Sequence, residues 1–131
     1  MIIDGKGLPM GRLASFAAKS ALKGEEVIIL NCREVIITGR KKNIEAEFQE
    51  ERSKMGSSLK GPKHHRNSER IIKKTIRGML PNHREGRGRI ALKRIMCYAG
   101  VPKEYEGKPT VEMKREAKQK YIEVKNLEKR R

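Results

Sequence analysis

The sequence predicts an α/β fold, and three observations support this prediction. Short apolar runs, typical of strands, occur at residues 1–4, 27–30, 35–38 and 95–99. Between the first two runs, small and apolar residues recur at spacings of three and four, which is the period of one buried helix face. The strand–helix–strand order indicates helices packed on a small, mostly parallel sheet.

The N-terminal half is expected to form this α/β unit. Residues 1–4 predict a strand, followed by a helix that starts at Met10 and ends before Gly24. The shared face of that helix comprises Leu13, Phe16, Ala17 and Ala21. Residues 27–30 are apolar at every position, as in a strand covered on both faces. Residues 35–38 predict a third strand. Only about four residues separate it from the run at 27–30, whereas parallel neighbours usually need a crossover of a dozen or more residues. The position of this strand in the sheet therefore stays open.

A second helix and a long loop are expected next. Residues 39–54 have Ile44 and Phe48 on one side, and an acidic outer face consists of Glu45, Glu47, Glu50 and Glu51. This face is expected to point away from any polyanionic partner. Residues 55–67 contain glycines, serines and a proline without an apolar period. We predict that this cationic segment is a loop that is poorly ordered in the free protein.

Two short helices and the last strand are predicted between residues 68 and 99. The first helix is capped by Asn67 or Ser68, and its buried stripe is Ile71, Ile72, Ile76 and Met79 or Leu80. Pro81 ends this helix, and residues 89–94 predict another, with Ile90 and Leu92 as candidate core residues. Residues 95–99 would be the last strand of the sheet. A polar helix near 111–120 and a strand or docking segment at 121–124 complete the chain.

The charge is distributed very unevenly along the 131 residues. Residues 1–51 are neutral, whereas residues 52–95 contain fourteen lysines and arginines and two glutamates, or +12 of the total +16. With a pI of about 10.2, this distribution is typical of a scaffold that presents a cationic surface to nucleic acid. We therefore expect a single domain, 1–131, in three parts. These are a neutral α/β half (1–51), a basic RNA-binding segment with the last strand (52–100) and a charged C-terminal extension (101–131).

The basic segment supplies most of the candidate RNA-binding residues. Arginines beside glycines allow the backbone to approach a phosphate strand while the guanidinium groups bind it. Arg12, at a predicted helix N-terminus, also suits a phosphate. None of the five aromatic residues lies in the basic segment, which disfavours base stacking and favours folded RNA recognised by shape and backbone. The candidates are Arg12, Lys60, Lys63, His64, His65, Arg66, Arg70, Lys73, Lys74, Arg77, Gly78, Arg84, Arg87, Gly88, Arg89, Lys93 and Arg94.

Two alternatives come from other functional classes. The glycine loop Gly5–Gly11 lies between a strand and a helix, where a small nucleotide-binding enzyme would hold phosphates. Its spacing fits neither the Walker loop, whose first glycine is replaced by Lys6, nor the dinucleotide fingerprint, whose third glycine is replaced by Met10. A DNA-binding architectural protein is the other alternative, which a preference for duplex DNA would favour.

Catalytic, metal and membrane signals are weak. The three histidines and two cysteines lack the spacing of metal ligands, so neither a metal nor a cofactor is expected. Cys32 and Cys97 predict reduced, buried thiols of a cytoplasmic protein. The chain has no apolar run of the ~20 residues that a membrane span requires, no secretory signal at its start, and no group of residues that indicates a small-molecule substrate.

Three groups of short motifs resemble a known family. The central group is Ile76–Pro81 with Gly86-Arg87-Gly88-Arg89, Tyr98-Ala-Gly100 and Pro102. The second group is Gly11–Ser15 with Asn31 and Val35–Gly39, and the third is the run from Lys120 to Val124. Together they resemble the large-subunit ribosomal protein family L-thirteen, in its archaeal and eukaryotic form. The resemblance implies a three-layer α/β/α fold around a four-stranded parallel sheet. It also implies a non-enzymatic protein of the cytoplasmic large ribosomal subunit, bound to ribosomal RNA and neighbouring ribosomal proteins.

The chain also departs from the family pattern in two places. The loop before Arg66 has Pro-Lys-His-His where relatives usually have an aromatic residue, and the segment after Val124 is short.

Overall fold

A computed structural model describes residues 1–54, 56–113 and 120–128. Its main sheet consists of β1 (Ile2–Asp4), β2 (Val27–Leu30) and β4 (Ile95–Cys97), in the order β1-β2-β4. Both pairings are parallel, and Ile29 aligns with Ile3 on one side and with Cys97 on the other. The predicted α/β class, with a mostly parallel sheet, is confirmed.

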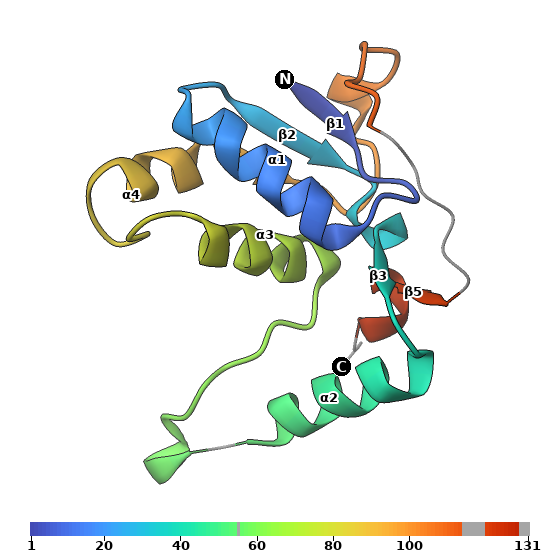
Figure 1. Cartoon of the computed structure of the whole chain (residues 1–131), viewed down its shortest axis with the longest axis vertical. Helices are drawn as coiled ribbons and strands as arrows, with labels where there is room; N and C mark the ends of the chain where they lie inside the picture. Colours follow the sequence, from blue (N-terminus) through green and yellow to red (C-terminus); the bar gives the residue numbers. More distant parts are fainter. Residues whose placement is uncertain (55, 114–119, 129–131) are drawn as a thin grey trace.

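Three helices cover one face of this sheet (Figure 1). They are α1 (Met10–Leu22), α3 (Ser68–Met79) and α4 (Gly86–Lys93), and α1 packs against both of the others. Five residues of α1 are small or apolar and almost inaccessible: Leu13, Ala14, Ala17, Ala18 and Ala21. Small side chains let the helix lie close to its neighbours, so the period read from the sequence reports a real packing face.

The other face of the main sheet is only partly covered. Because side chains alternate along a strand, Ile2 and Ile28 point to this second face together with Met96. Both isoleucines are half-buried, and Met96 is 46% exposed.

A second, two-stranded sheet accounts for the third predicted strand. β3 (Ile36–Thr38) pairs antiparallel with β5 (Tyr121–Glu123), so the main sheet has three strands and not the four that were expected. The chain leaves β2 through Asn31, whose φ of 54° is left-handed, and through the 3₁₀ helix η1 (Cys32–Glu34). This linker is too short to carry the chain over the sheet, which is why β3 lies beside the main sheet.

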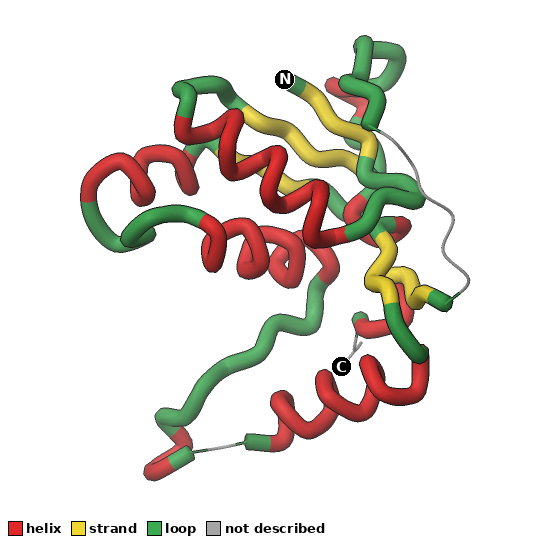
Figure 2. The backbone as a smooth tube through the Cα atoms, viewed as in Figure 1, coloured by secondary structure: helices red, strands yellow, loops and turns green. Residues whose placement is uncertain are grey.

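The basic segment starts in the last turn of α2 (Lys41–Ser53) and crosses a long loop to α3 (Figure 2). The loop contains only the short 3₁₀ helix η2 (Ser57–Leu59). Ile44 and Phe48 point inward as predicted, with Ile44 buried and Phe48 partly buried. The α3 stripe is also confirmed, since Ile71, Ile72 and Ile76 are buried; between the two alternatives for its end, Leu80 is buried and Met79 is 43% exposed.

The helix after Pro81 differs from the prediction in its start and in its buried side. α4 begins at Gly86, three residues before the expected start. Ile90, expected in the core, is 52% exposed, whereas Ala91 is fully buried. The buried face of α4 consists of Gly88 and Ala91, because small residues allow this helix to lie against the chain at Pro81 and against α1.

The C-terminal residues hold the start of α3. The predicted strand at 121–124 is present as β5 and leads into the 3₁₀ helix η4 (Val124–Leu127). The Glu128 carboxylate then accepts hydrogen bonds from the backbone N–H (3.2 Å) and the hydroxyl of Ser68. Neither Asn67 nor Ser68 forms the side-chain cap that was expected, since a carboxylate from the C-terminal segment occupies this position. Most of the polar helix predicted near 111–120 lies outside the described residues.

Candidate nucleic-acid interface

The lysines and arginines between residues 60 and 94 have no acidic partners within the part of the chain that the structure describes. Among the described residues, no lysine or arginine in this range forms a salt bridge with a carboxylate. Elsewhere, cations pair within the protein, as in Lys6–Glu34 (3.7 Å) and Lys54–Glu50 (3.3 Å). The exposed members of the candidate set are Arg12, Lys60, Lys63, Arg66, Arg70, Arg84, Arg87, Arg89 and Lys93. The loop between α2 and α3, helix α3 and the elbow formed by residues 80–89 thus present a surface whose charge the described residues do not neutralise.

Three of the sequence-predicted residues also hold the fold. Lys73 donates from Nζ to the carbonyl oxygen of Ile95 at 2.8 Å, which ties α3 to β4. Arg94 donates from Nη1 to the carbonyl oxygen of Ala21 at 3.3 Å, which satisfies an acceptor in the last turn of α1. Both side chains are half-buried. Gly88 is buried, so its role in the structure is packing.

The two candidate glycines differ sharply in the space around them. A Cβ on Gly88 would lie 1.9 Å from the carbonyl oxygen of Pro81 and 2.7 Å from that of Asn82. A Cβ on Gly78 would meet nothing within 4 Å. The missing side chain of Gly88 therefore allows the elbow to close on itself. That of Gly78 leaves an open place on the surface of α3.

A cluster of charged side chains joins α2, the loop and α3. Nδ1 of His64 lies 3.2 Å from Nζ of Lys74 and 3.2 Å from Oε2 of Glu51. Glu51 was expected to point away from RNA, yet it reaches the basic loop because α2 lies alongside it. Burial, reinforced by the nearby cations Arg70, Lys74 and Arg77 and by His64, lowers the pKa of His65 below its ordinary value.

Arg52 anchors the same region from the other side. Its Nη2 donates to the carbonyl oxygens of His65 (3.2 Å) and Leu127. Its guanidinium also lies over the Phe48 ring, 5.5 Å from the centroid. Burial, followed by the charge of Arg66, lowers its pKa. Although Arg52 belongs to the basic segment, these contacts make it a tie between the loop and the C-terminal residues.

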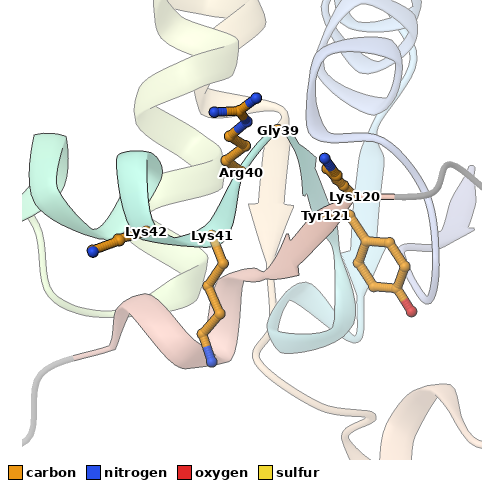
Figure 3. Close-up of a pocket in the computed structure, with 6 residues that line it drawn as sticks. All are labelled: Gly39, Arg40, Lys41, Lys42, Lys120 and Tyr121. Carbon is orange, nitrogen blue, oxygen red and sulfur yellow. The ribbon is translucent and has the colours of Figure 1, made fainter.

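A second cationic site lies outside the basic segment and was missed in the sequence (Figure 3). A cavity of about 410 Å³ is lined by Gly39, Arg40, Lys41, Lys42, Lys120 and Tyr121. The backbone N–H of Gly39 donates to the carbonyl oxygen of Lys120 at 3.0 Å, which brings the two segments together. In Figure 3, the side chains of Arg40 and Lys120 lie on either side of Gly39, and the exposed Tyr121 ring projects away from both.

These four cations do not stand out in the sequence because they are divided between a neutral half and the C-terminal extension. Lys41 pairs with Glu45 at 3.9 Å. No described carboxylate forms a salt bridge with the other three. The only signal available in the sequence was the short run Arg40-Lys41-Lys42, and its pairing with Lys120 depends on the β3–β5 sheet.

The glycine loop that suggested nucleotide binding is occupied by internal hydrogen bonds. The backbone N–H groups of Gly5, Gly7 and Leu8 donate to the carbonyl oxygens of Leu30, Glu34 and Gly5 at 2.9–3.1 Å. A phosphate-binding loop needs such groups free to point at its ligand. This loop fastens β1 to the end of β2 and to η1. The alternative of a nucleotide-dependent enzyme loses its structural basis.

Other candidate sites are limited within the ranges 1–54, 56–113 and 120–128. No group of three or more His, Cys, Asp or Glu residues there could hold a metal ion. No helix in those ranges is both long and apolar enough to cross a membrane. Cys32 and Cys97 are free thiols; Cys32 is buried as expected, whereas Cys97 is only half-buried. A hydrogen bond to Cys97 together with burial raises the pKa of Cys32.

Comparison with known proteins gives a consistent result. Residues 1–104 match the family model described as Ribosomal protein L13. A Methanococcoides burtonii protein named Large ribosomal subunit protein uL13 is 41% identical over 128 residues, covering 94% of this chain and 91% of the relative. Proteins of the same name from Methanosphaera stadtmanae and Methanocaldococcus jannaschii are 42% and 45% identical. They cover 86% and 78% of this chain, and the matches span 80% and 76% of the relatives.

Proposed function

Since the chain belongs to the ribosomal protein L13 family, we propose that it binds and braces folded ribosomal RNA in the large ribosomal subunit of the cytoplasm. The family resemblance expected from the sequence is confirmed, and the family is one of structural ribosomal proteins rather than enzymes. The matching relatives are archaeal, in agreement with the archaeal form that the sequence resembles.

The observation that carries the RNA-binding proposal is the uncompensated charge of residues 60–94. Several cations elsewhere in the fold pair with carboxylates, such as Lys6 with Glu34 and Lys54 with Glu50, whereas the lysines and arginines of residues 60–94 have no such partner among the described residues. Phosphates of an RNA backbone would supply the missing counter-charge. Lys73, Arg94 and Gly88 would support this surface from beneath, because each also makes a contact inside the fold.

We propose that the cavity beside Gly39 contributes a second set of phosphate contacts. Arg40, Lys42 and Lys120 would bind the backbone there, with Tyr121 available for stacking. Residues 1–51 and 101–131 would thus contact the RNA directly as well as support the basic segment. Neighbouring large-subunit proteins would contact parts of the surface that the RNA leaves free.

Binding of the purified full chain to large-subunit ribosomal RNA tests this proposal. If some six to ten phosphates are contacted, the plot of log K against log [salt] should have a slope of roughly −4 to −9. A slope near −1, or tighter binding to duplex DNA than to the ribosomal RNA, would contradict the proposal. Co-sedimentation of the chain with the large subunit from a native lysate at low salt is the expected companion result.

Three arginine variants separate binding from folding. Replacement by alanine should change the free energy of unfolding by no more than ~0.5 kcal/mol, as at ordinary surface sites. Affinity for the RNA should fall by roughly 1.5–3 kcal/mol for each charge-assisted hydrogen bond that the substitution removes. The variants are Arg77→Ala, Arg87→Ala and Arg89→Ala. Lys23→Ala, at an exposed cation of the neutral half, is the matched control and should bind as the unchanged protein does.

A further inference from the structure

A cavity between the two halves of the chain combines apolar walls with a cationic rim. It has a volume of about 210 Å³ and lies among the start of α1, the second half of α2, the loop and α3. Met10, Phe48 and Ile71 provide its apolar surface, and His65 and Lys74 are among its polar residues. The cavity is smaller than the ~300–1,000 Å³ of typical small-molecule pockets, so it suits one ring system rather than a whole cofactor.

The charges around the cavity favour a nucleic acid as the source of that ring. Lys74 lines it, and Arg70 and Arg77 lie close enough to His65 to lower the pKa of its imidazole. Glu51 lines it as well. A carboxylate at this position disfavours a phosphate inside the cavity, whereas it can accept a hydrogen bond from the amino group of a base. The phosphates belong at the rim and the base inside.

The aromatic surface and the open entrance complete this arrangement. The Phe48 ring is half-buried, with the guanidinium of Arg52 over one face at 5.5 Å. Gly78 lines the cavity from α3, and the space where its side chain would stand is empty for 4 Å. Proteins that recognise RNA take splayed-out bases onto aromatic rings and guanidinium planes.

We propose that this cavity is a socket for a single unstacked base of the ribosomal RNA. The proposal rests on the function proposed above and adds a base contact to a surface otherwise suited to phosphates. Base stacking was disfavoured from the sequence because the basic segment contains no aromatic residue. The fold removes that objection, since it brings Phe48 of the neutral half beside His65 of the basic loop.

Two variants and one control test the socket in the full-length protein. Gly78→Leu fills the entrance, and Phe48→Leu removes the ring while keeping an apolar side chain. Gly100→Leu is the matched control, because a Cβ on Gly100 also meets nothing within 4 Å and Gly100 lies outside the cavity. Circular dichroism and thermal unfolding establish that each variant is folded.

The readout is chemical probing of large-subunit ribosomal RNA at single-nucleotide resolution, with base methylation and 2′-hydroxyl acylation. The unchanged protein should protect the base edge of one unpaired nucleotide. Gly78→Leu and Phe48→Leu should abolish that protection while the rest of the footprint persists. Their affinity should fall by roughly 5- to 150-fold, the effect of removing one stacked base. Gly100→Leu should behave as the unchanged protein does.

Other outcomes distinguish the two proposals. An identical footprint and affinity for Gly78→Leu and the unchanged protein would overturn the socket while leaving RNA binding intact. The socket would also be overturned if the base edge is protected only after a neighbouring ribosomal protein is added, because that protein and not this cavity would then protect the base. If the unchanged protein leaves no footprint at all, the proposed function itself fails.

Discussion

Alanine substitution at two glycines of the basic segment should change stability in opposite directions. In Gly88→Ala the new Cβ would lie 1.9 Å from the carbonyl oxygen of Pro81 and 2.8 Å from its carbonyl carbon. These are backbone atoms that cannot rotate away, so the cost lies at the upper end of the ~1–3 kcal/mol of overpacking. Alanine in a helix returns up to ~1 kcal/mol. We expect a net decrease of about 2 kcal/mol in the free energy of unfolding, the difference between these two effects.

Gly78→Ala supplies the comparison within the same protein. Its new Cβ would meet nothing within 4 Å, so only the helix propensity changes and the protein should gain up to ~1 kcal/mol. Urea unfolding without RNA, followed by far-UV circular dichroism, measures both variants. With a slope of ~2 kcal/mol/M, the midpoint should fall by roughly 1 M for Gly88→Ala and rise by up to roughly 0.5 M for Gly78→Ala. Equal midpoints would refute the packing role assigned to Gly88.

Three further results are expected. Glu128→Ala should destabilise the protein by ~1–3 kcal/mol, because the buried Ser68 hydroxyl and N–H would have no acceptor; an unchanged urea midpoint would show that water replaces the carboxylate. The pKa of His65 is lowered in the folded state, so the unfolded chain binds more protons below pH 6.5. The free energy of unfolding should therefore decrease as the pH falls from 6.5 toward the folded-state pKa. Unfolding experiments at several pH values should show that His65→Gln removes this part of the decrease in the free energy of unfolding. Amides of the loop between α2 and α3 should exchange rapidly in the free protein and slowly in the RNA complex, and equal exchange in both states would contradict a loop ordered by RNA.

Local patterns predicted the elements of this fold well. The spacing of Leu13, Ala17 and Ala21 and the stripe of Ile72 and Ile76 lie on buried faces, because a helix that packs on one side repeats its contacts every three to four residues. Pro81 ends α3, since proline removes a donor and clashes with the preceding turn. Such signals act within a few residues and are therefore visible in a single sequence.

Which side of a short helix is buried, and which strand pairs with which, were harder to predict from the sequence. Ile90 has a larger apolar side chain than Ala91 and would be the better core residue. The close contact between Gly88 and Pro81 nevertheless determines which side of α4 faces inward. A neighbour's shape decides which side is buried, and a short helix offers too few residues to average out the ambiguity. Likewise, the partner of β3 is a strand more than eighty residues away in the chain.

The candidate site was predicted in its charge and not in its geometry. The uncompensated cations of residues 60–94 follow from composition, because so few acids lie among them. Composition does not predict which of these cations are exposed and which also make contacts inside the fold. Lys73 and Arg94 look like any other cation in the sequence, yet each donates to a backbone carbonyl inside the structure.

By itself, the sequence determined the α/β class, the position of most elements, the family and the basic character of the second half. Each of these depends on short-range periodicity, composition or motifs. Only the tertiary structure decided that β3 leaves the main sheet, that the backbones of Gly39 and Lys120 meet so that Arg40 and Lys120 line one cavity, and that Phe48 reaches the basic loop. These contacts join segments that are far apart in the chain. They form because packing of the core and pairing of β3 with β5 determine where each segment lies in space.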